Sequence, residues 1–210
     1  MPHDEVRYEY RVFIASCAEL GERMHAAGGA PERHESADTY ILARENLPHS
    51  VKLRDGRLDT KFLRGRYRGL EQWAPLPKVG FPIPDGMLAD LLGPALHLEQ
   101  PLPRGAGETE ARLLETLRGM GSLLIVEIVK RRSVFRLGQC VAEIVAADCN
   151  GTTLHSACVE CADAEQAYAL VVELGLDAWP NVSYMAAARS VVGLAGSEFE
   201  GMQTGEATHR

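Results

Sequence analysis

Polar and apolar residues alternate with a period of two over several stretches of this chain, a pattern that predicts β-strands. In residues 5–14, charged side chains fall on one face, while tyrosine, valine and isoleucine fall mostly on the other. Further strands are predicted at 38–44, 67–73, 123–135, 140–148 and 153–161. Residues 50–54 and 57–63 are predicted to form a hairpin, because Asp55-Gly56 between them is a strong two-residue turn signal.

The other periodic stretches predict helices at 15–27, 85–92, 107–119 and 163–174. Asp163 is a suitable N-cap for the fourth of these helices, and Gly175 is a suitable stop. A last helix is expected to begin at Asn181 or Ser183 and to end near Val192. Residues 31–36 are predicted to be loop, and 75–84, with four prolines, a linker. We therefore expect a single domain over 1–192 and a disordered tail over 193–210.

The charged faces of the strands are unusual, because Glu, Lys and Arg repeat at every second position opposite a strongly apolar face. The predicted helices are numerous enough to cover the apolar face, and the charged faces would then line an interior. An α+β fold satisfies both conditions if eight antiparallel strands form a closed tunnel barrel with a charged lumen and helices packed outside. The alternative is an open sheet on helices, with one charged face in water.

Charge is unevenly distributed along the chain. The 22 basic and 29 acidic residues give a net charge of −7, which argues against a general nucleic-acid coat. Segments 44–68 and 128–136 nevertheless carry net charges of +5 and +4, so the remainder carries −16. Two basic segments on predicted strands inside an acidic protein suit a short anionic ligand better than a long polyanion.

Several classes of function are excluded or disfavoured. No apolar run approaches the roughly 20 residues of a membrane span, the N-terminus lacks the features of a signal peptide, and five cysteines without a dense framework suggest reduced thiols. We therefore expect a cytoplasmic protein. Cys158 and Cys161 do not predict a zinc site, because residues three apart on a strand point to opposite faces. Glycine-rich phosphate loops are absent, so phosphate recognition would depend on side chains.

Four segments, taken in order, resemble the CYTH, or triphosphate tunnel, family. They are Arg7-Tyr8-Glu9-Tyr10-Arg11; Asp38-Thr39-Tyr40 followed by the hairpin from Val51 to Lys61; Lys130-Arg131-Arg132 followed by Glu143 and Asp148; and Ser183-Tyr184 at the start of the last helix. Together they extend over about residues 5–192. The resemblance implies a tunnel in which basic side chains grip a linear triphosphate and acidic side chains hold one or two divalent cations.

The resemblance also implies an activity and a set of site residues. Typical activities are hydrolysis of inorganic or organic triphosphates, with cyclisation of ATP less favoured here. The implied cofactor is Mg²⁺ or Mn²⁺, which prefers oxygen ligands. The implied substrate-binding residues are Arg11, Lys52, Arg54, Lys61, Lys130, Arg132 and Arg136, and the implied metal ligands are Glu9, Glu160, Glu143 and Asp148.

The chain departs from the family pattern on the metal side. Arg7 replaces the first glutamate of the N-terminal signature, and Cys158 stands where a second glutamate would accompany Glu160. Glu143 and Asp148 are five residues apart, so a regular strand cannot point both into one lumen without a bulge. Two hypotheses follow: a metal-dependent triphosphatase, or a non-catalytic relative that binds a phosphorylated ligand or polyphosphate. Neither nucleic acid nor a membrane is an expected partner, and a homodimer is left open.

Overall fold

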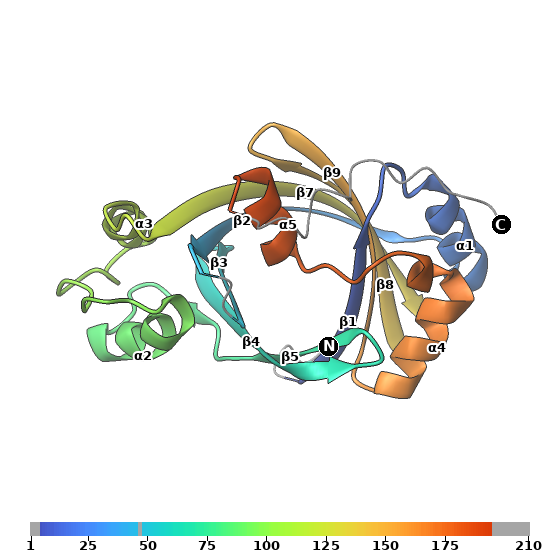
Figure 1. Ribbon diagram of the computed structural model, residues 1–210, viewed down its shortest axis with the longest axis horizontal. Coiled ribbons are helices and arrows are strands. Elements are labelled where there is room, and N and C mark those ends of the chain that lie inside the picture. The colour runs from blue at the N-terminus through green and yellow to red at the C-terminus, as the bar shows by residue number, and fades with distance from the viewer. Residues whose placement is uncertain (1–4, 46–47, 195–210) are drawn as a thin grey trace. The chain divides into compact units, whose positions relative to one another are not determined.

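The computed structural model describes residues 5–45 and 48–194 (Figure 1). The strands within these residues are β1 (Arg7–Phe13), β2 (Glu32–Ala43), β3 (His49–Arg54), β4 (Arg57–Tyr67), β5 (Leu70–Pro75), β6 (Val79–Gly80), β7 (Leu123–Leu137), β8 (Cys140–Cys149) and β9 (Thr152–Cys161). The helices are α1 (Ala18–Gly28), α2 (Asp85–Leu96), α3 (Glu110–Arg118), α4 (Ala164–Leu174), α5 (Tyr184–Val191) and the short 3₁₀ helix η1 (Leu176–Ala178). Within the described ranges, none of the helices has the length and apolar character needed to cross a membrane.

The strands form one sheet in the order β3-β2-β7-β8-β9-β1-β5-β4-β6. A further pairing between β3 and β4 joins the two ends of the first eight strands, which closes an eight-stranded antiparallel barrel and leaves β6 outside it. The predicted α+β fold with a closed eight-stranded barrel is therefore confirmed. Closure removes the unpaired edges that an open sheet of this size would expose.

Three sequence predictions are corrected. Residues 32–36, expected to be loop, form the first part of β2; residues 32–35 are all exposed, so no apolar alternation marks them as strand. β4 continues to Tyr67, and the chain turns at Arg68-Gly69, both with positive φ, before β5 begins at Leu70. α2 runs on to Leu96 because Ala95 and Leu96 are buried in the core. The predicted tail lies outside the described residues from position 195 onward.

The described part of the chain divides into two compact units. Unit 1 comprises residues 5–6, 37–45, 48–64 and 73–128, and unit 2 comprises residues 7–36, 65–72 and 129–194.

In unit 2, β1, β9 and β8 lie side by side in antiparallel register, with Arg11 opposite Cys158 and Glu143 also opposite Cys158. The β8–β9 register continues to Cys149 and Thr152 without a bulge. One face of these strands is apolar and forms a core with α1 and α4, which lie beside it in Figure 1. Asp163 caps α4 through the Gln166 backbone N–H and Gly175 ends it with positive φ, as predicted. The charged positions therefore occupy the opposite face.

The segment before α5 is anchored to β1 by Asn181. Its amide oxygen accepts a hydrogen bond from the Arg11 backbone N–H at 2.8 Å, and its amide nitrogen donates to the backbone oxygens of Glu9 and Gly69 at 3.0 and 2.8 Å. Ser183 is the N-cap of α5, as one of the two predicted starts required. Tyr184 is thereby held over the charged face of β1, so this helix begins on the polar side rather than the apolar side of the strands.

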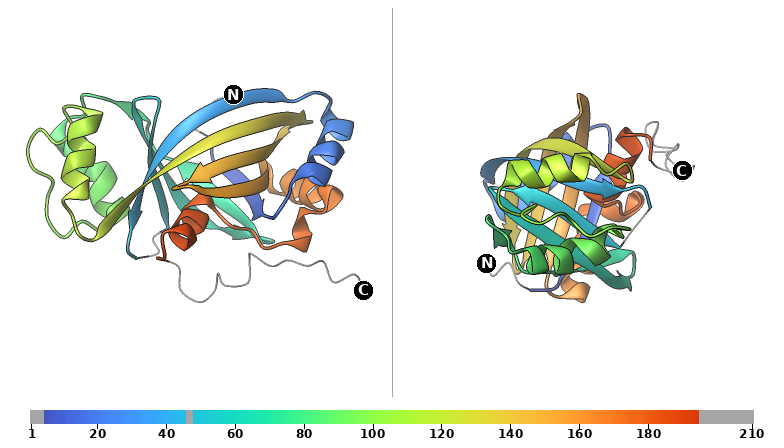
Figure 2. Two further views of the ribbon diagram at one scale, coloured as in Figure 1. Left: turned by 90° about the horizontal axis from the view of Figure 1, so that it is seen from above. Right: turned by 90° about the vertical axis from the view of Figure 1, so that its left-hand side faces the viewer.

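In unit 1, the β3–β4 hairpin turns at Asp55-Gly56, where both residues have positive φ, as a two-residue hairpin turn requires. Val51, Leu53 and Leu58 face one side of the hairpin and are buried in a core with residues of α2 and α3. Figure 2 shows these two helices next to each other. Lys52 and Asp59 are opposite each other in register and have the other parity, so the hairpin directs its charges away from this core.

Candidate functional site

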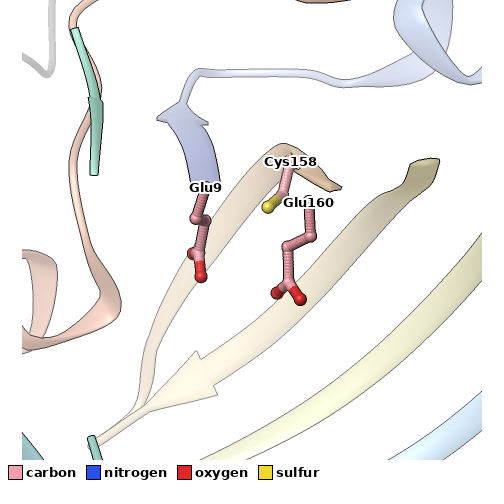
Figure 3. A group of neighbouring side chains, drawn as sticks. All are labelled: Glu9, Cys158 and Glu160. Carbon is pink, nitrogen blue, oxygen red and sulfur yellow. The ribbon is translucent and has the colours of Figure 1, made fainter. Parts of the chain in front are cut away.

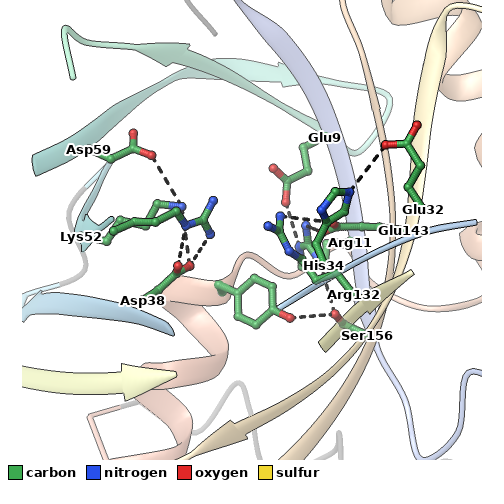
Figure 4. A network of polar contacts seen from close by, with 12 residues as sticks. Glu9, Arg11, Glu32, His34, Asp38, Lys52, Asp59, Arg132, Glu143 and Ser156 are labelled. Carbon is green, nitrogen blue, oxygen red and sulfur yellow. Dashed lines mark hydrogen bonds and ion pairs between the residues drawn. The ribbon is translucent and has the colours of Figure 1, made fainter. Parts of the chain in front are cut away.

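The charged face of unit 2 is organised around the Arg11 guanidinium, which is 3% exposed (Figure 4). Its Nε donates to Glu9 Oε1 at 2.9 Å, its Nη2 to Glu143 Oε1 at 2.6 Å, and its Nη1 to Ser156 Oγ at 3.3 Å. One guanidinium thus joins side chains of β1, β8 and β9. We call this set, with Tyr184, Lys130, Arg132, Cys158 and Glu160, the Arg11 group.

Burial and neighbouring charges shift the pKa values of this group in opposite directions. Burial alone would raise the pKa of Glu143, but Arg11 and Arg132 outweigh it and hold that pKa below its ordinary value. Burial would likewise lower the pKa of Arg11, but the neighbouring Cys158, Glu9 and Glu143 raise it well above its ordinary value. At neutral pH, Arg11 and Glu143 are therefore a buried, charged pair.

Tyr184 separates the cations of the group. Arg11 lies over its ring at 4.6 Å from the centroid, and the buried Lys130 ammonium lies 3.6 Å from the same centroid. Both are within cation–π range. The phenol oxygen is 3.1 Å from Ser156 Oγ, and burial raises the pKa of Tyr184. The ring therefore contacts two like charges, one from β1 and one from β7.

Arg132 contributes a third cation and an unusual donor. Its Nη1 is 3.9 Å from Glu143 Oε2, and its side chain is 24% exposed. Its Nε is buried and has no hydrogen-bond partner in the described part of the chain. A buried guanidinium N–H without an acceptor is costly, and an oxygen of an anion would satisfy it.

Glu9, Cys158 and Glu160 offer ligand atoms that all lie within 4.8 Å of one another. Figure 3 shows their side chains on the same side of β1 and β9. Glu9 and Glu160 are directly opposite in register, so like charges meet there, and a divalent cation would relieve their repulsion. Burial raises the pKa of Cys158 well above its ordinary value, against the opposing effect of Arg11. The two carboxylates, rather than the thiol, therefore fit Mg²⁺ or Mn²⁺.

Unit 1 holds a second set of ionic side chains, the Asp38 group, comprising Asp38, Tyr40, Lys52, Arg54, Asp59, Lys61 and Lys78. Asp38 is 1% exposed and binds the Arg54 guanidinium with both carboxylate oxygens (Figure 4). The Lys52 ammonium is 3.8 Å from Asp38 and 3.7 Å from Asp59, and Lys78 is 3.2 Å from Asp59. Asp59 Oδ1 is buried and has no hydrogen-bond partner among the described residues.

Three cations of the Asp38 group, Lys52, Arg54 and Lys78, contact its carboxylates Asp38 and Asp59, and Lys61 adds positive charge near Asp59. Burial and the nearby Arg54, with a smaller contribution from Lys61, lower the pKa of Lys52 to about 8 despite Asp38 and Asp59. The carboxylates therefore do not fully compensate the buried ammonium. An additional anion would do so.

Two residues from the sequence-derived set are not brought into either group. Asp148 is exposed at the β8–β9 turn, where it accepts a hydrogen bond from the Gly151 backbone N–H at 3.1 Å. It cannot join Glu143, because the regular register of β8 puts the two on opposite faces. Arg136 is 57% exposed and pairs with Glu32 at 3.2 Å. Neither residue lies with the others in this structure.

Sequence reasoning missed Lys78 and Ser156 as members of these groups. Lys78 lies in a proline-rich stretch without periodicity, and only the β4–β6 pairing, with Leu58 opposite Val79, brings it next to Asp59. Ser156 lies on the same face of its predicted strand as Cys158 and Glu160. This shared face was the one signal in the sequence that could have identified it.

Replacing Arg11 by methionine removes the shared partner of Glu9 and Glu143. We expect Arg11→Met to destabilise folding by about 3–5 kcal/mol at pH 7, because buried carboxylates are left uncompensated. In the wild type, Glu143 contributes stability that is present above its ordinary pKa and is lost as pH falls. In the variant, burial raises the pKa of Glu143. The difference in free energy of unfolding between the wild type and the variant should therefore narrow from pH 7 to pH 5.

Urea unfolding curves of both proteins at the two pH values measure this difference. Arg131→Met, at an exposed position on the same strand as Arg132, is the matched control and should change little. A pH-independent difference would contradict the proposed ionisation of Glu143.

Comparison with known proteins places this geometry in a fold. No protein-family model and no curated protein sequence matches the chain. A solved structure of a candidate adenylyl cyclase from Hippeastrum, described as having a dominant triphosphatase activity, is 12% identical; the match covers 88% of this chain and 96% of that one, with a TM-score of 0.51.

Two further solved structures match in the same way. A candidate adenylate cyclase from Bacillus halodurans is 11% identical over 86% of this chain and 96% of its own, with a TM-score of 0.51. The mimivirus capping enzyme triphosphatase is 10% identical over 82% and 89%, with a TM-score of 0.50. At these identities the likeness concerns the backbone, and it shows that the chain has the fold of CYTH-type proteins.

Proposed function

We propose that this protein binds a triphosphate and acts as a metal-dependent phosphohydrolase on an inorganic or organic triphosphate. The observation that carries the proposal is the convergence of Lys52, Arg54 and Lys78 on Asp38 and Asp59, with Lys52 only 8% exposed and its pKa lowered to about 8. Triphosphatase activity described for two proteins of the same fold supports it.

In the Asp38 group, we assign phosphate binding to Lys52, Arg54 and Lys61, as the sequence implied, and add Lys78. A phosphate carries several acceptor oxygens, and ammonium and guanidinium donors on neighbouring strands can contact it from different directions. Asp38 and Asp59 orient these donors rather than bind the ligand, since each already lies within 4 Å of two cations.

In the Arg11 group, we assign phosphate binding to Lys130 and Arg132, with the unsatisfied Arg132 Nε as the most specific donor. Arg11 positions the carboxylates by its bonds to Glu9 and Glu143. Glu9 and Glu160 would hold Mg²⁺ or Mn²⁺, which when bound supplies charge neutralisation and activation of water for phosphoryl transfer. The cations of this chain would bind the phosphate oxygens and stabilise the negative charge that develops on them.

A second candidate function is binding without hydrolysis. The observation that favours it is the pairing of Arg11 with two of the carboxylates, Glu9 and Glu143, at 2.9 and 2.6 Å. Together with Cys158 in place of a carboxylate, this leaves few oxygen ligands for a cation. The two candidates share the phosphate-binding residues and differ in turnover alone.

Lys52→Met tests the phosphate-binding assignment. We expect the variant to bind tripolyphosphate at least about tenfold more weakly, because a buried ammonium in contact with phosphate is lost. Its thermal stability should be equal or higher, since a poorly compensated buried charge is replaced by an apolar chain of similar size. Isothermal titration measures the affinity for tripolyphosphate, and thermal unfolding measures the stability.

Arg136→Met, which removes an exposed arginine paired with Glu32, is the control and should bind as the wild type does. Equal affinity in Lys52→Met and the wild type would refute the assignment of Lys52.

Phosphate release from tripolyphosphate and ATP, measured with Mg²⁺, with Mn²⁺ and after chelation, separates the two candidates. The hydrolase predicts metal-dependent release that falls at least about 100-fold in Glu160→Gln, with binding of metal-free tripolyphosphate retained. The binder predicts affinity without turnover under every condition. Absence of binding to any polyphosphate would contradict both.

A further inference from the structure

Cys140 and Cys161 form a pair of thiols on adjoining strands of unit 2. The β8–β9 register ends with Val141 opposite Glu160, and one further step places Cys140 opposite Cys161. Both residues are the terminal residues of their strands. Burial, with a smaller contribution from the neighbouring Cys161, raises the pKa of the Cys140 thiol, and both residues are free thiols in the structure.

Directly opposite residues of antiparallel strands have Cα atoms about 4.5–5.5 Å apart. A disulfide requires about 4.4–6.8 Å between Cα atoms. Continued by one step, the register therefore places the backbone of the pair within the Cα range of a disulfide.

Of the other three cysteines, Cys17 shares the core with Cys140 and Cys161 but is not in a strand, and the two on β8 and β9 lack a cysteine opposite them in the register. Cys149 is opposite Thr152, while Cys158 is opposite Arg11 on one side and Glu143 on the other. Cys158 also points to the charged face, whereas Cys140 and Cys161 belong to the apolar core under the helices. The pairing is thus specific to one position of the β8–β9 ladder.

We propose that Cys140 and Cys161 are an oxidation site that forms a cross-strand disulfide with a low-molecular-weight disulfide as oxidant. One thiol, as its thiolate, attacks oxidised glutathione, forming a mixed disulfide and releasing one glutathione thiol. The second cysteine then displaces the second glutathione. Overall, two cysteine thiols lose two protons and two electrons, one protein S–S bond forms, and the oxidant is reduced to two glutathione molecules.

Burial sets the conditions for this reaction. Cys140 is 4% exposed and Cys161 is 2% exposed, so the oxidant reaches them only when the end of the ladder opens. The pair adjoins the exposed turn residues Gly138 and Gln139 on one strand and the exposed Ala162 on the other. Strand ends open far more often than the middle of a sheet. The reaction should therefore be slow in buffer and faster in sub-denaturing urea.

The bond would affect the charged face, because Cys161 directly follows Glu160. A covalent link at this position fixes the β9 backbone beside one of the carboxylates that faces Glu9. The disulfide would therefore restrict the geometry of the carboxylates in the Arg11 group. Its formation does not depend on the proposed phosphate chemistry.

The full-length protein, incubated with excess oxidised glutathione with and without sub-denaturing urea, provides the test. Free thiols counted after denaturation should fall from five to three, and peptide mapping should recover one linked pair, Cys140–Cys161. Cys149→Ala, a buried cysteine on the same strand, should still form the bond, whereas Cys140→Ala and Cys161→Ala should not.

Five free thiols after incubation with urea, stable glutathione adducts on single cysteines, or a link to Cys17, Cys149 or Cys158 would overturn the proposal. The wild-type map decides the question without the variants, so a failure of one variant to fold does not leave the proposal open.

Discussion

Charge buried on the polar face of β-strands is the constraint on which the rest of this structure depends. A buried ion is tolerated only with opposite charge or hydrogen-bonding partners nearby, and both ionic groups follow this rule in different ways. In the Arg11 group, one guanidinium bonds to two carboxylates, and the Tyr184 ring contacts the Lys130 ammonium. In the Asp38 group, two carboxylates contact three cations, and the pKa of Lys52 falls to about 8.

The fold was largely predictable because its determinants are periodic. Alternation over residues 5–14, the Asp55-Gly56 turn and the caps Asp163, Gly175 and Ser183 each specify local structure that the chain adopts. The exposed start of β2 and the end of β4 were mispredicted because both faces of the strand are in water there, which removes the apolar signal. Closure of the barrel depends on the β3–β4 and β5–β4 pairings, which join strands whose charged faces the sequence already suggested to be interior.

The types of residue in the candidate site were predictable from the sequence, whereas the ion pairs between them were less so. The family resemblance implied Glu9, Arg11, Lys52, Lys130 and Arg132, and the structure buries or half-buries these residues. Neither the resemblance nor strand parity reveals which carboxylate meets which cation. The dual role of Arg11 depends on the β1–β9–β8 order, and the approach of Lys78 to Asp59 depends on a two-residue strand, β6. The resemblance also implied Asp148 and Arg136, and both lie near strand ends, where side chains reach water.

The most direct test of the central claim is the ionisation of Lys52 measured by NMR. The chain has only four lysines, so selective ¹⁵N labelling and the Lys52→Met variant assign the signal. We predict a pKa near 8 for Lys52 in the free protein and a rise of at least about one unit when tripolyphosphate binds, since phosphate favours the charged form. A pKa near the ordinary value of about 10.4 in the free protein, or no change on adding tripolyphosphate, would contradict the account.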